Sequence, residues 1–166
     1  MQADFLGEVI DHLCGMDICI ETSGYGKSSH FRRLIERVDH VFYDIKIMDS
    51  EKHKEYTGKD NALILRNAKI LMDSGIPFTV RIPLIRGVNC DVRNMRAVVS
   101  FLKNAESLRE IELLPYNRLA GAKYSLLGMV YTHDDFQPPE KAELQELKNV
   151  IENSGMRCKM RESLFI

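Results

Sequence analysis

Apolar residues follow two periods along the chain, one typical of helices and the other typical of strands. Apolar positions three to four residues apart predict helices at Phe5–Leu13, Phe31–Val38, Ala62–Ser74, Val92–Asn104 and Pro139–Asn153. Short apolar runs predict strands at Asp17–Glu21, Val41–Lys46, Phe78–Ile85, Glu110–Leu114 and Met156–Met160. The polar stretch 49–60 is assigned no element, and 115–138 is expected to be a long loop.

Turn and cap residues mark several of these boundaries. Gly24 lies in the turn after the first strand, and Gly75 is a natural stop for the helix that precedes it. Asn61 and Asp91 are expected to cap the helices that follow them, because their side chains accept hydrogen bonds from exposed backbone N–H groups. Pro139 suits the first turn of the last helix.

The alternation of strands and helices predicts a single α/β domain over residues 1–166 with a parallel sheet. Helices that cover such a sheet explain why the strands are nearly continuous apolar runs. In parallel β/α folds, ligands bind at the carboxyl ends of the strands. The residues at those ends are therefore the first candidates for a site.

Charged and polar residues stand at the ends of four successive strands. They are Glu21, Thr22, Asp44, Lys46, Arg81 and Asn117. Because side chains alternate along a strand, Asp44 and Lys46 share the face opposite to apolar Tyr43 and Ile45. A lone buried charge costs several kcal/mol, so the carboxylate and the ammonium together make a polar floor. With the Arg81 guanidinium, they predict a pocket for a zwitterionic ligand such as an amino acid.

Four of these residues also have a purely structural interpretation. Asp44 and Lys46 are equally well explained as a buried ion pair, Arg81 as a solvated edge residue, and Glu21 as a cap of its turn. Glu112 alternates with apolar neighbours and is either an inward carboxylate or a solvent-facing one.

Composition excludes several classes of protein. The chain has 166 residues and a net charge of −1, so no electrostatic capture of nucleic acid or of an anionic membrane is expected. No apolar run is long enough to span a bilayer, and the start has no signal-peptide pattern. We therefore expect a cytoplasmic protein.

The four cysteines are dispersed along the chain, at Cys14, Cys19, Cys90 and Cys158. Zinc and iron–sulfur sites need more closely spaced ligands than these. We interpret them as structural thiols, which stay reduced in the cytoplasm.

Five motifs occur in the order and spacing of one enzyme family. They are Ile20-Glu21-Thr22-Ser23-Gly24-Tyr25, Tyr43-Asp44-Ile45-Lys46, Tyr56-Thr57-Gly58 with Asn61, Arg81-Ile82-Pro83-Leu84-Ile85 with Gly87-Val88-Asn89, and Leu113-Leu114-Pro115-Tyr116-Asn117. Over nearly its full length, the chain resembles the radical S-adenosylmethionine enzymes that activate glycyl radical enzymes, of the pyruvate formate-lyase activating enzyme type.

The resemblance implies a partial (β/α) barrel and an oxidoreductase. In the family, a [4Fe-4S] cluster binds S-adenosylmethionine and delivers one electron, giving methionine and a 5′-deoxyadenosyl radical. That radical removes a hydrogen atom from a backbone glycine of the partner. The implied partners are a glycyl radical enzyme, such as pyruvate formate-lyase or a relative, and an electron donor such as flavodoxin.

The resemblance also implies roles for the strand-end residues. Glu21 and Thr22 would lie beside the carboxylate of S-adenosylmethionine and, with Asp44, hold a monovalent cation. Asp44 and Lys46 would hold the methionine end of the cofactor, and Arg81 would reach its polar groups. Asn117 stands where the family has a histidine near the adenosine; it keeps the hydrogen bonding and loses the titratable ring. No catalytic residue is assigned.

Two family motifs have no counterpart in this sequence, the three-cysteine cluster loop and the Gly-Gly-Glu-Pro segment. Both belong to the first two βα units, so we expect a carboxy-terminal fragment without iron–sulfur ligands. Such a fragment should not cleave S-adenosylmethionine alone. It should self-associate through the exposed edge of its first strand.

Two other functions stay open. One is an aldolase-like β/α enzyme with Lys46 as its Schiff-base nucleophile. That chemistry needs an uncharged lysine, and the neighbouring Asp44 favours the charged form. The other is a non-catalytic module that docks a partner through segment 117–136.

Overall fold

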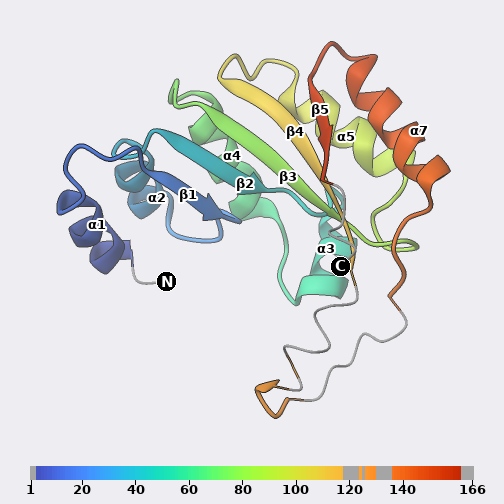
Figure 1. Ribbon diagram of the computed structural model, residues 1–166, viewed down its shortest axis with the longest axis horizontal. Helices are drawn as coiled ribbons and strands as arrows, with labels where there is room; N and C mark the ends of the chain where they lie inside the picture. The colour runs from blue at the N-terminus through green and yellow to red at the C-terminus, as the bar shows by residue number, and fades with distance from the viewer. Residues whose placement is uncertain (1–2, 118–123, 125, 130–135, 162–166) are drawn as a thin grey trace.

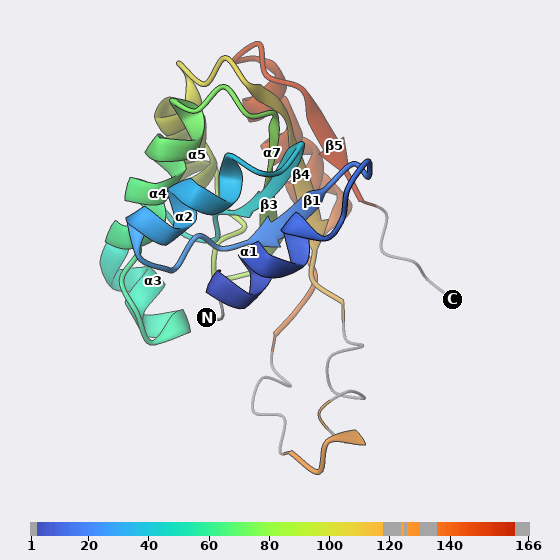
Figure 2. The same cartoon turned by 90° about the vertical axis from the view of Figure 1, so that its left-hand side faces the viewer.

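The computed structural model describes residues 3–117, 124, 126–129 and 136–161. Its elements, in chain order, are α1 (Ala3–Asp11), β1 (Cys19–Thr22), α2 (Ser28–Ile35), β2 (His40–Asp44), α3 (Ser50–Thr57), α4 (Ala62–Met72), β3 (Phe78–Leu84), α5 (Val92–Leu102), β4 (Leu108–Pro115), α7 (Lys141–Glu152) and β5 (Cys158–Met160). Figures 1 and 2 show one twisted sheet with helices α2, α4 and α5 packed behind it.

The sheet has five strands in the order β1-β2-β3-β4-β5, and every neighbouring pair is parallel. Right-handed crossovers between strands that follow one another in this way place the connecting helices on a single face. The strand order does not reverse, as it does in doubly wound folds, and matches that of a β/α barrel. The predicted α/β fold with a parallel sheet is confirmed.

The hydrophobic core lies between the sheet and its helices. Val41 and Tyr43 are 0% exposed and Ile45 is 1% exposed, so the apolar side of β2 faces the helices as predicted. Leu71 of α4 and Met95 of α5 are fully buried in the same cluster. Burying a side chain of this size contributes roughly 1.5–3 kcal/mol, which explains why the periodic segments fold as they do.

The opposite face of the sheet is polar, and Figure 1 shows no helix over it among the described residues. Residues in register on neighbouring parallel strands point to the same face. One row across this face is Asp44, Arg81, Glu112 and Lys159. Because the row crosses four strands, it brings together charges that are far apart in the sequence.

One helix was missed by the sequence interpretation. The polar stretch 49–60 contains α3 (Ser50–Thr57), whose one buried residue is His53. Its ends carry ordinary signals: Asp49 accepts a hydrogen bond from the Lys52 N–H, and Gly58 ends the helix with φ 75°. A helix that is polar on nearly all sides has no apolar stripe, so periodicity could not reveal it.

Two predicted helix starts also need correction. Asn61 occupies the cap position of α4 but makes no capping bond with its side chain; Asp60 accepts the Ala62 N–H instead. Pro139 does not open the last helix. Glu140 caps α7 in a capping box with Glu143, because two carboxylates there satisfy two orphan N–H donors. The predicted cap at Asp91 is confirmed by its 2.8 Å bond from the Asn94 N–H.

Candidate functional site

Arg81 lies at the centre of the polar face and organises it. Its strand β3 is in the middle of the sheet, and the residue is only 7% exposed. The Nε donates to Glu112 Oε2 over 2.7 Å, and Nη1 donates to Glu21 Oε2 over 2.6 Å. The guanidinium carbon also stacks 3.9 Å from the centre of the Phe42 ring. The interpretation of Arg81 as a solvated edge residue is therefore wrong.

Glu112 is the inward carboxylate that the alternation in β4 allowed. It is 3% exposed, and its second oxygen lies 4.0 Å from Lys159 Nζ and 3.8 Å from Arg161 Nε. A buried charge of one sign is costly unless the opposite sign is adjacent. Arg81 and Glu112 therefore require each other, and Arg81 in turn holds Glu21.

Among the carboxylates of the described residues, Asp44 has the perturbed titration. Partial burial raises the pKa of Asp44; Lys46 and Arg81 oppose this, and the Glu21 carboxylate adds to it. Burial outweighs the nearby cations because it removes water from the charged form. A ligand that brings a positive charge to Asp44 would therefore stabilise its charged carboxylate.

Lys46 lies next to Asp44, where two hollows meet. One, of about 190 Å³, is lined by Asp44 and Lys46 together with Ser23, Tyr25, His53 and others. The other, of about 300 Å³, is lined by the same pair together with Tyr56, Pro83, Asn89 and Phe136. The larger hollow is at the lower end of the range for small-molecule pockets. Both hollows are thus lined by Asp44 and Lys46, two of the predicted pocket residues, whereas Arg81 is not among the residues that line either one.

Thr22 and Asn117 lie apart from the charged residues on the polar face. Thr22 is in register with Tyr43, on the other face from Glu21, and its hydroxyl accepts the Gly24 N–H over 2.9 Å. Asn117 is exposed, two residues beyond the end of β4. Most of the predicted docking segment 117–136 lies outside the described residues.

An aromatic group borders the larger hollow and was not among the predicted site residues. The ring of Phe136 lies 6.5 Å from that of Tyr56 and 6.1 Å from that of Tyr116. Such pairs present a flat apolar wall. Tyr56 and Tyr116 belong to motifs of the resemblance, so the motifs contained the signal for two of the three.

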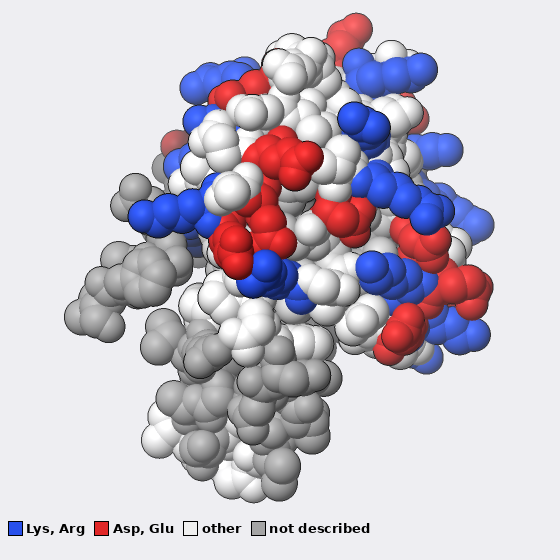
Figure 3. All heavy atoms as spheres, turned by 90° about the vertical axis from the view of Figure 1, so that its right-hand side faces the viewer, with Lys and Arg blue, Asp and Glu red and all other residues white. Residues whose placement is uncertain are grey.

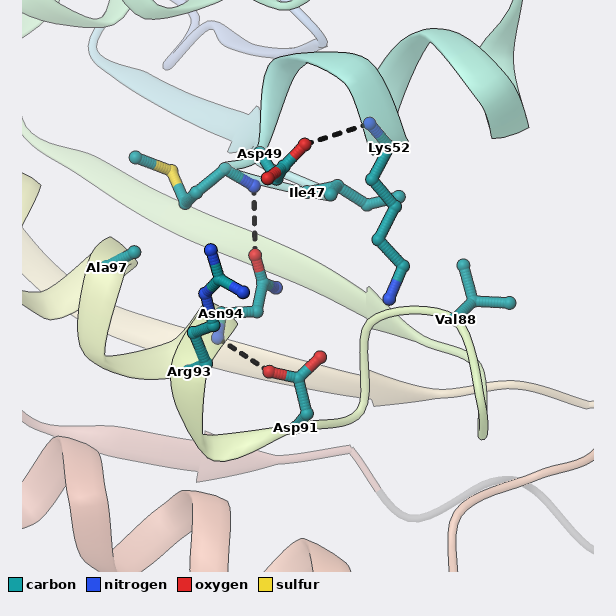
Figure 4. Close-up of a pocket in the computed structure, with 9 residues that line it drawn as sticks. Ile47, Asp49, Lys52, Val88, Asp91, Arg93, Asn94 and Ala97 are labelled. Atoms are coloured by element: carbon teal, nitrogen blue, oxygen red, sulfur yellow. Dashed lines mark hydrogen bonds between the residues drawn. The ribbon is translucent and has the colours of Figure 1, made fainter.

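A further hollow, of about 450 Å³, lies between the starts of α3 and α5 (Figure 4). Lys52 and Arg93 line it, but so do Asp49 and Asp91, the carboxylates that already cap the two helices. It contains none of the predicted site residues. We therefore place the site at the polar face.

The side of the molecule on which α7 lies carries many charges, with acidic side chains gathered across its middle (Figure 3). Many of these charges are paired: Arg86 contacts Glu140 at 2.8 Å and Glu143 at 3.3 Å, and Lys148 lies 3.6 Å from Glu152. Exposed pairs of this kind contribute little.

The described residues fit one of the two cofactors of the resembled family. Asp44, Lys46 and the adjacent hollows suit the amino-acid part of S-adenosylmethionine, which carries one charge of each sign. No group of three or more His, Cys, Asp or Glu residues in the described part could hold a metal ion. Burial raises the pKa of Cys90 and of Cys158 to about 11. None of the described helices has the length and apolarity needed to cross a membrane.

Comparison with known proteins supports the resemblance. Over 162 residues, the chain is 38% identical to the trans-4-hydroxy-L-proline dehydratase activating enzyme of Clostridioides difficile. It is 36% identical over 162 residues to the 4-hydroxyphenylacetate decarboxylase activating enzyme of C. difficile strain 630. Its homologues are glycyl radical enzyme activating enzymes. A third activating enzyme, for pyruvate formate-lyase 2 in Escherichia coli K12, is 28% identical over 159 residues.

The chain spans about half the length of the activating enzymes it matches. The alignments cover 95% of this chain but 53%, 51% and 54% of the three relatives, in the order given. No family model matches the chain.

Solved structures show the same fold. A domain of pyruvate-formate lyase-activating enzyme from Bacteroides vulgatus aligns with a TM-score of 0.80 and 24% identity, over 96% of this chain and 91% of that one. A radical SAM methyltransferase from Sphaerobacter thermophilus aligns with a TM-score of 0.61 and 17% identity, over 89% of this chain and 40% of that one. At these identities, the likeness establishes the fold alone.

Proposed function

We propose that this chain is the S-adenosylmethionine-binding portion of a glycyl radical enzyme activating enzyme. The observation that carries the proposal is the convergence of four charged residues on one polar face: Glu21, Asp44 and Lys46 at the carboxyl ends of β1 and β2, and Arg81 within β3. Parallel β/α folds bind their ligands there. The homologues, which are radical S-adenosylmethionine enzymes, support the choice of ligand.

The charges of the site match those of the proposed ligand. The cofactor's amino-acid part presents an ammonium and a carboxylate, which Asp44 and Lys46 complement. A ligand cation beside Asp44 would offset the cost of its partial burial. Arg81 would act through Nη2, because Nε and Nη1 already bind Glu112 and Glu21.

The proposal extends to a monovalent cation held by Glu21, Thr22 and Asp44. Oxygen ligands of this kind suit hard cations. Binding would require the Thr22 hydroxyl to leave its bond with the Gly24 N–H. Asn117 is proposed to contact the adenosine.

The whole enzyme would act on a glycyl radical enzyme. Relatives of this chain are named for a dehydratase, a decarboxylase and a pyruvate formate-lyase, so the partner belongs to that wider group. An electron donor such as flavodoxin, self-association through β1 and a cytoplasmic location are part of the same proposal. The iron–sulfur cluster, whose ligands the described residues do not provide, would come from the part of the protein that this chain does not span.

Calorimetric titration with S-adenosylmethionine tests the proposal. Lys46→Ala should weaken binding about ten- to a hundredfold, because a hydrogen bond to a charged group is worth about 1.5–3 kcal/mol. Lys52→Ala is the matched control, since Lys52 is also half-buried but lines the hollow between α3 and α5. The control should leave the Kd unchanged. Equal losses in both variants, or no binding by the unmutated chain, would refute the proposal.

A further inference from the structure

The backbone that carries Lys46 lies beyond the last strand pairing of β2. The strand ends at Asp44, and the final backbone bond to β3 runs from the Ile45 N–H to Arg81 O over 3.0 Å. The next three residues, 46–48, leave the sheet before α3 begins. Buried backbone groups must find partners, so this segment needs another source of hydrogen bonds.

Three asparagine side chains supply those bonds. Asn89 Nδ2 donates to Lys46 O over 2.8 Å, and Asn94 Nδ2 reaches the same oxygen over 3.3 Å. Asn61 Nδ2 donates to Ile47 O over 3.0 Å and to Met48 O over 2.9 Å. Asn94 Oδ1 accepts the Met48 N–H over 2.9 Å. Figure 4 shows the Asn94 amide reaching across from the start of α5.

These asparagines are buried and come from different elements. Asn61 and Asn89 are each 3% exposed and Asn94 is 8% exposed. Asn61 stands at the start of α4, Asn89 in the turn after β3, and Asn94 in the first turn of α5. Asn89 also donates to Pro83 O over 2.6 Å and accepts the Ile85 N–H over 2.8 Å. It therefore ties the end of β2 to the end of β3 where their ladder stops.

We infer that Asn61, Asn89 and Asn94 form an amide clamp that positions the Lys46 side chain beside Asp44. Only an amide provides two donors and an acceptor on one short side chain, and Asn89 and Asn94 each use both kinds of group. Ile47, 4% exposed, anchors the same segment in the core. With the backbone held at residues 46 to 48, Lys46 is directed to the opposite side, toward the two hollows.

The clamp can be tested without any ligand, by a carbon-13 NMR titration of the Asp44 carboxyl in a buffer free of sodium and potassium ions, because Asp44 is also a proposed ligand of a monovalent cation. In Asn89→Ala, Lys46 should move away, and the pKa of Asp44 should rise above that of the unmutated chain. Lys46, Glu21 and Arg81 are the charged groups that face Asp44. Glu21 and Arg81 stand on β1 and β3, which pair with β2, so the substitution should not move them.

Tyr43→Phe is the matched control. It removes another buried hydrogen bond, 2.7 Å from Tyr43 Oη to Ile64 O, on the helix side of the same strand. Both variants should unfold at lower urea concentration, but the control should leave the Asp44 titration unchanged. Equal titration curves in Asn89→Ala and the unmutated chain, or equal shifts in both variants, would overturn the clamp.

A second variant and a second measurement keep the inference testable if Asn89→Ala does not fold. Asn94→Ala removes the more exposed member and should shift the Asp44 titration in the same direction. In the unmutated chain, the Met48 amide should exchange with solvent as slowly as the β2 amides. Rapid exchange at Met48 would itself refute the clamp.

Only the predicted effect of the clamp on cofactor affinity rests on the proposed function. Asn89→Ala should raise the Kd for S-adenosylmethionine about tenfold, which is the effect of losing about 1.4 kcal/mol, while Tyr43→Phe should not change it. If the unmutated chain does not bind the cofactor, the proposed function fails. The NMR titration then still decides whether the clamp exists.

Discussion

Removal of the Glu112 carboxylate is the sharpest test of how the polar face is built. The side chains of Arg81 and Glu112 are 9% and 4% exposed, and their charged atoms are 2.7 Å apart. Glu112→Ala would leave the buried guanidinium with Glu21, whose side chain is 63% exposed and therefore largely solvated. Removing one member of a buried pair costs about 3–5 kcal/mol, because the remaining charge is uncompensated. Glu112→Gln keeps a neutral acceptor and should cost less.

An exposed pair of similar length provides the control. Arg33 and Asp4 lie 3.0 Å apart, with side chains 65% and 76% exposed. Asp4→Asn should cost about 0–1 kcal/mol, because water and salt screen the pair. Urea unfolding followed by circular dichroism gives both free energies, provided that the slope m is unchanged.

The two results together decide whether burial controls the strength of the pair. A loss in Glu112→Ala no larger than that in Asp4→Asn would show that Arg81 is not held by a buried pair. The double variant Arg81→Met with Glu112→Leu should recover most of the stability, since apolar replacements of buried pairs are often neutral or stabilising. It should nevertheless bind S-adenosylmethionine poorly, which separates the role of the pair in the site from its role in folding.

Three further predictions concern neighbouring features. Asp44→Asn should stabilise the fold at pH 7. Because the pKa of Asp44 is raised in the folded chain, the folded chain holds this proton more tightly than the unfolded one. The stability of the unmutated chain therefore falls as the pH rises from the ordinary pKa of aspartate through the raised one, and Asn avoids this loss. The gain should disappear in urea titrations below the ordinary pKa of aspartate, and a gain independent of pH would contradict the reasoning. Gly24→Ala should cost about 2–4 kcal/mol in thermal unfolding, because Gly24 has φ 67° and a Cβ there would collide with the Tyr43 ring; a loss below 1 kcal/mol would contradict it. Asp91→Ala should cost about 1 kcal/mol in urea unfolding through the lost cap of α5, and no measurable loss would show that the cap is not needed.

The predicted elements with a clear apolar period agree with the structure to within a few residues. Periodicity is a local property, so the β2 pattern alone established which side chains face the helices. Asp44, Lys46 and Arg81 could be named from the sequence because they interrupt such patterns, the first two at the end of β2 and the third within β3. α3 could not, because the helix has almost no buried face and its cap signals are short and common.

The contacts of the amides around Lys46 could not be predicted from the sequence, although Asn61 and Asn89 belong to the motifs of the resemblance. Asn89 and Asn94 lie 43 and 48 residues from the carbonyl they bind, and Asn61 lies 14 residues from Ile47. Asn61 was expected to cap its own helix, which is the ordinary local role of asparagine. Its amide instead binds the segment after β2, because α4 packs where that segment leaves the sheet.

The sequence by itself determined the alternation of strands and helices, the apolar side of the sheet and the identity of the charged residues at the strand ends. All of these depend on neighbours in the chain and on the burial of apolar surface. The tertiary structure alone decided which of those charges meet. Register across β1 to β4 paired Arg81 with Glu21 and Glu112, while Thr22 was turned to the other face. Such pairings depend on how strands align in space, and an isolated stretch of sequence carries no record of that alignment.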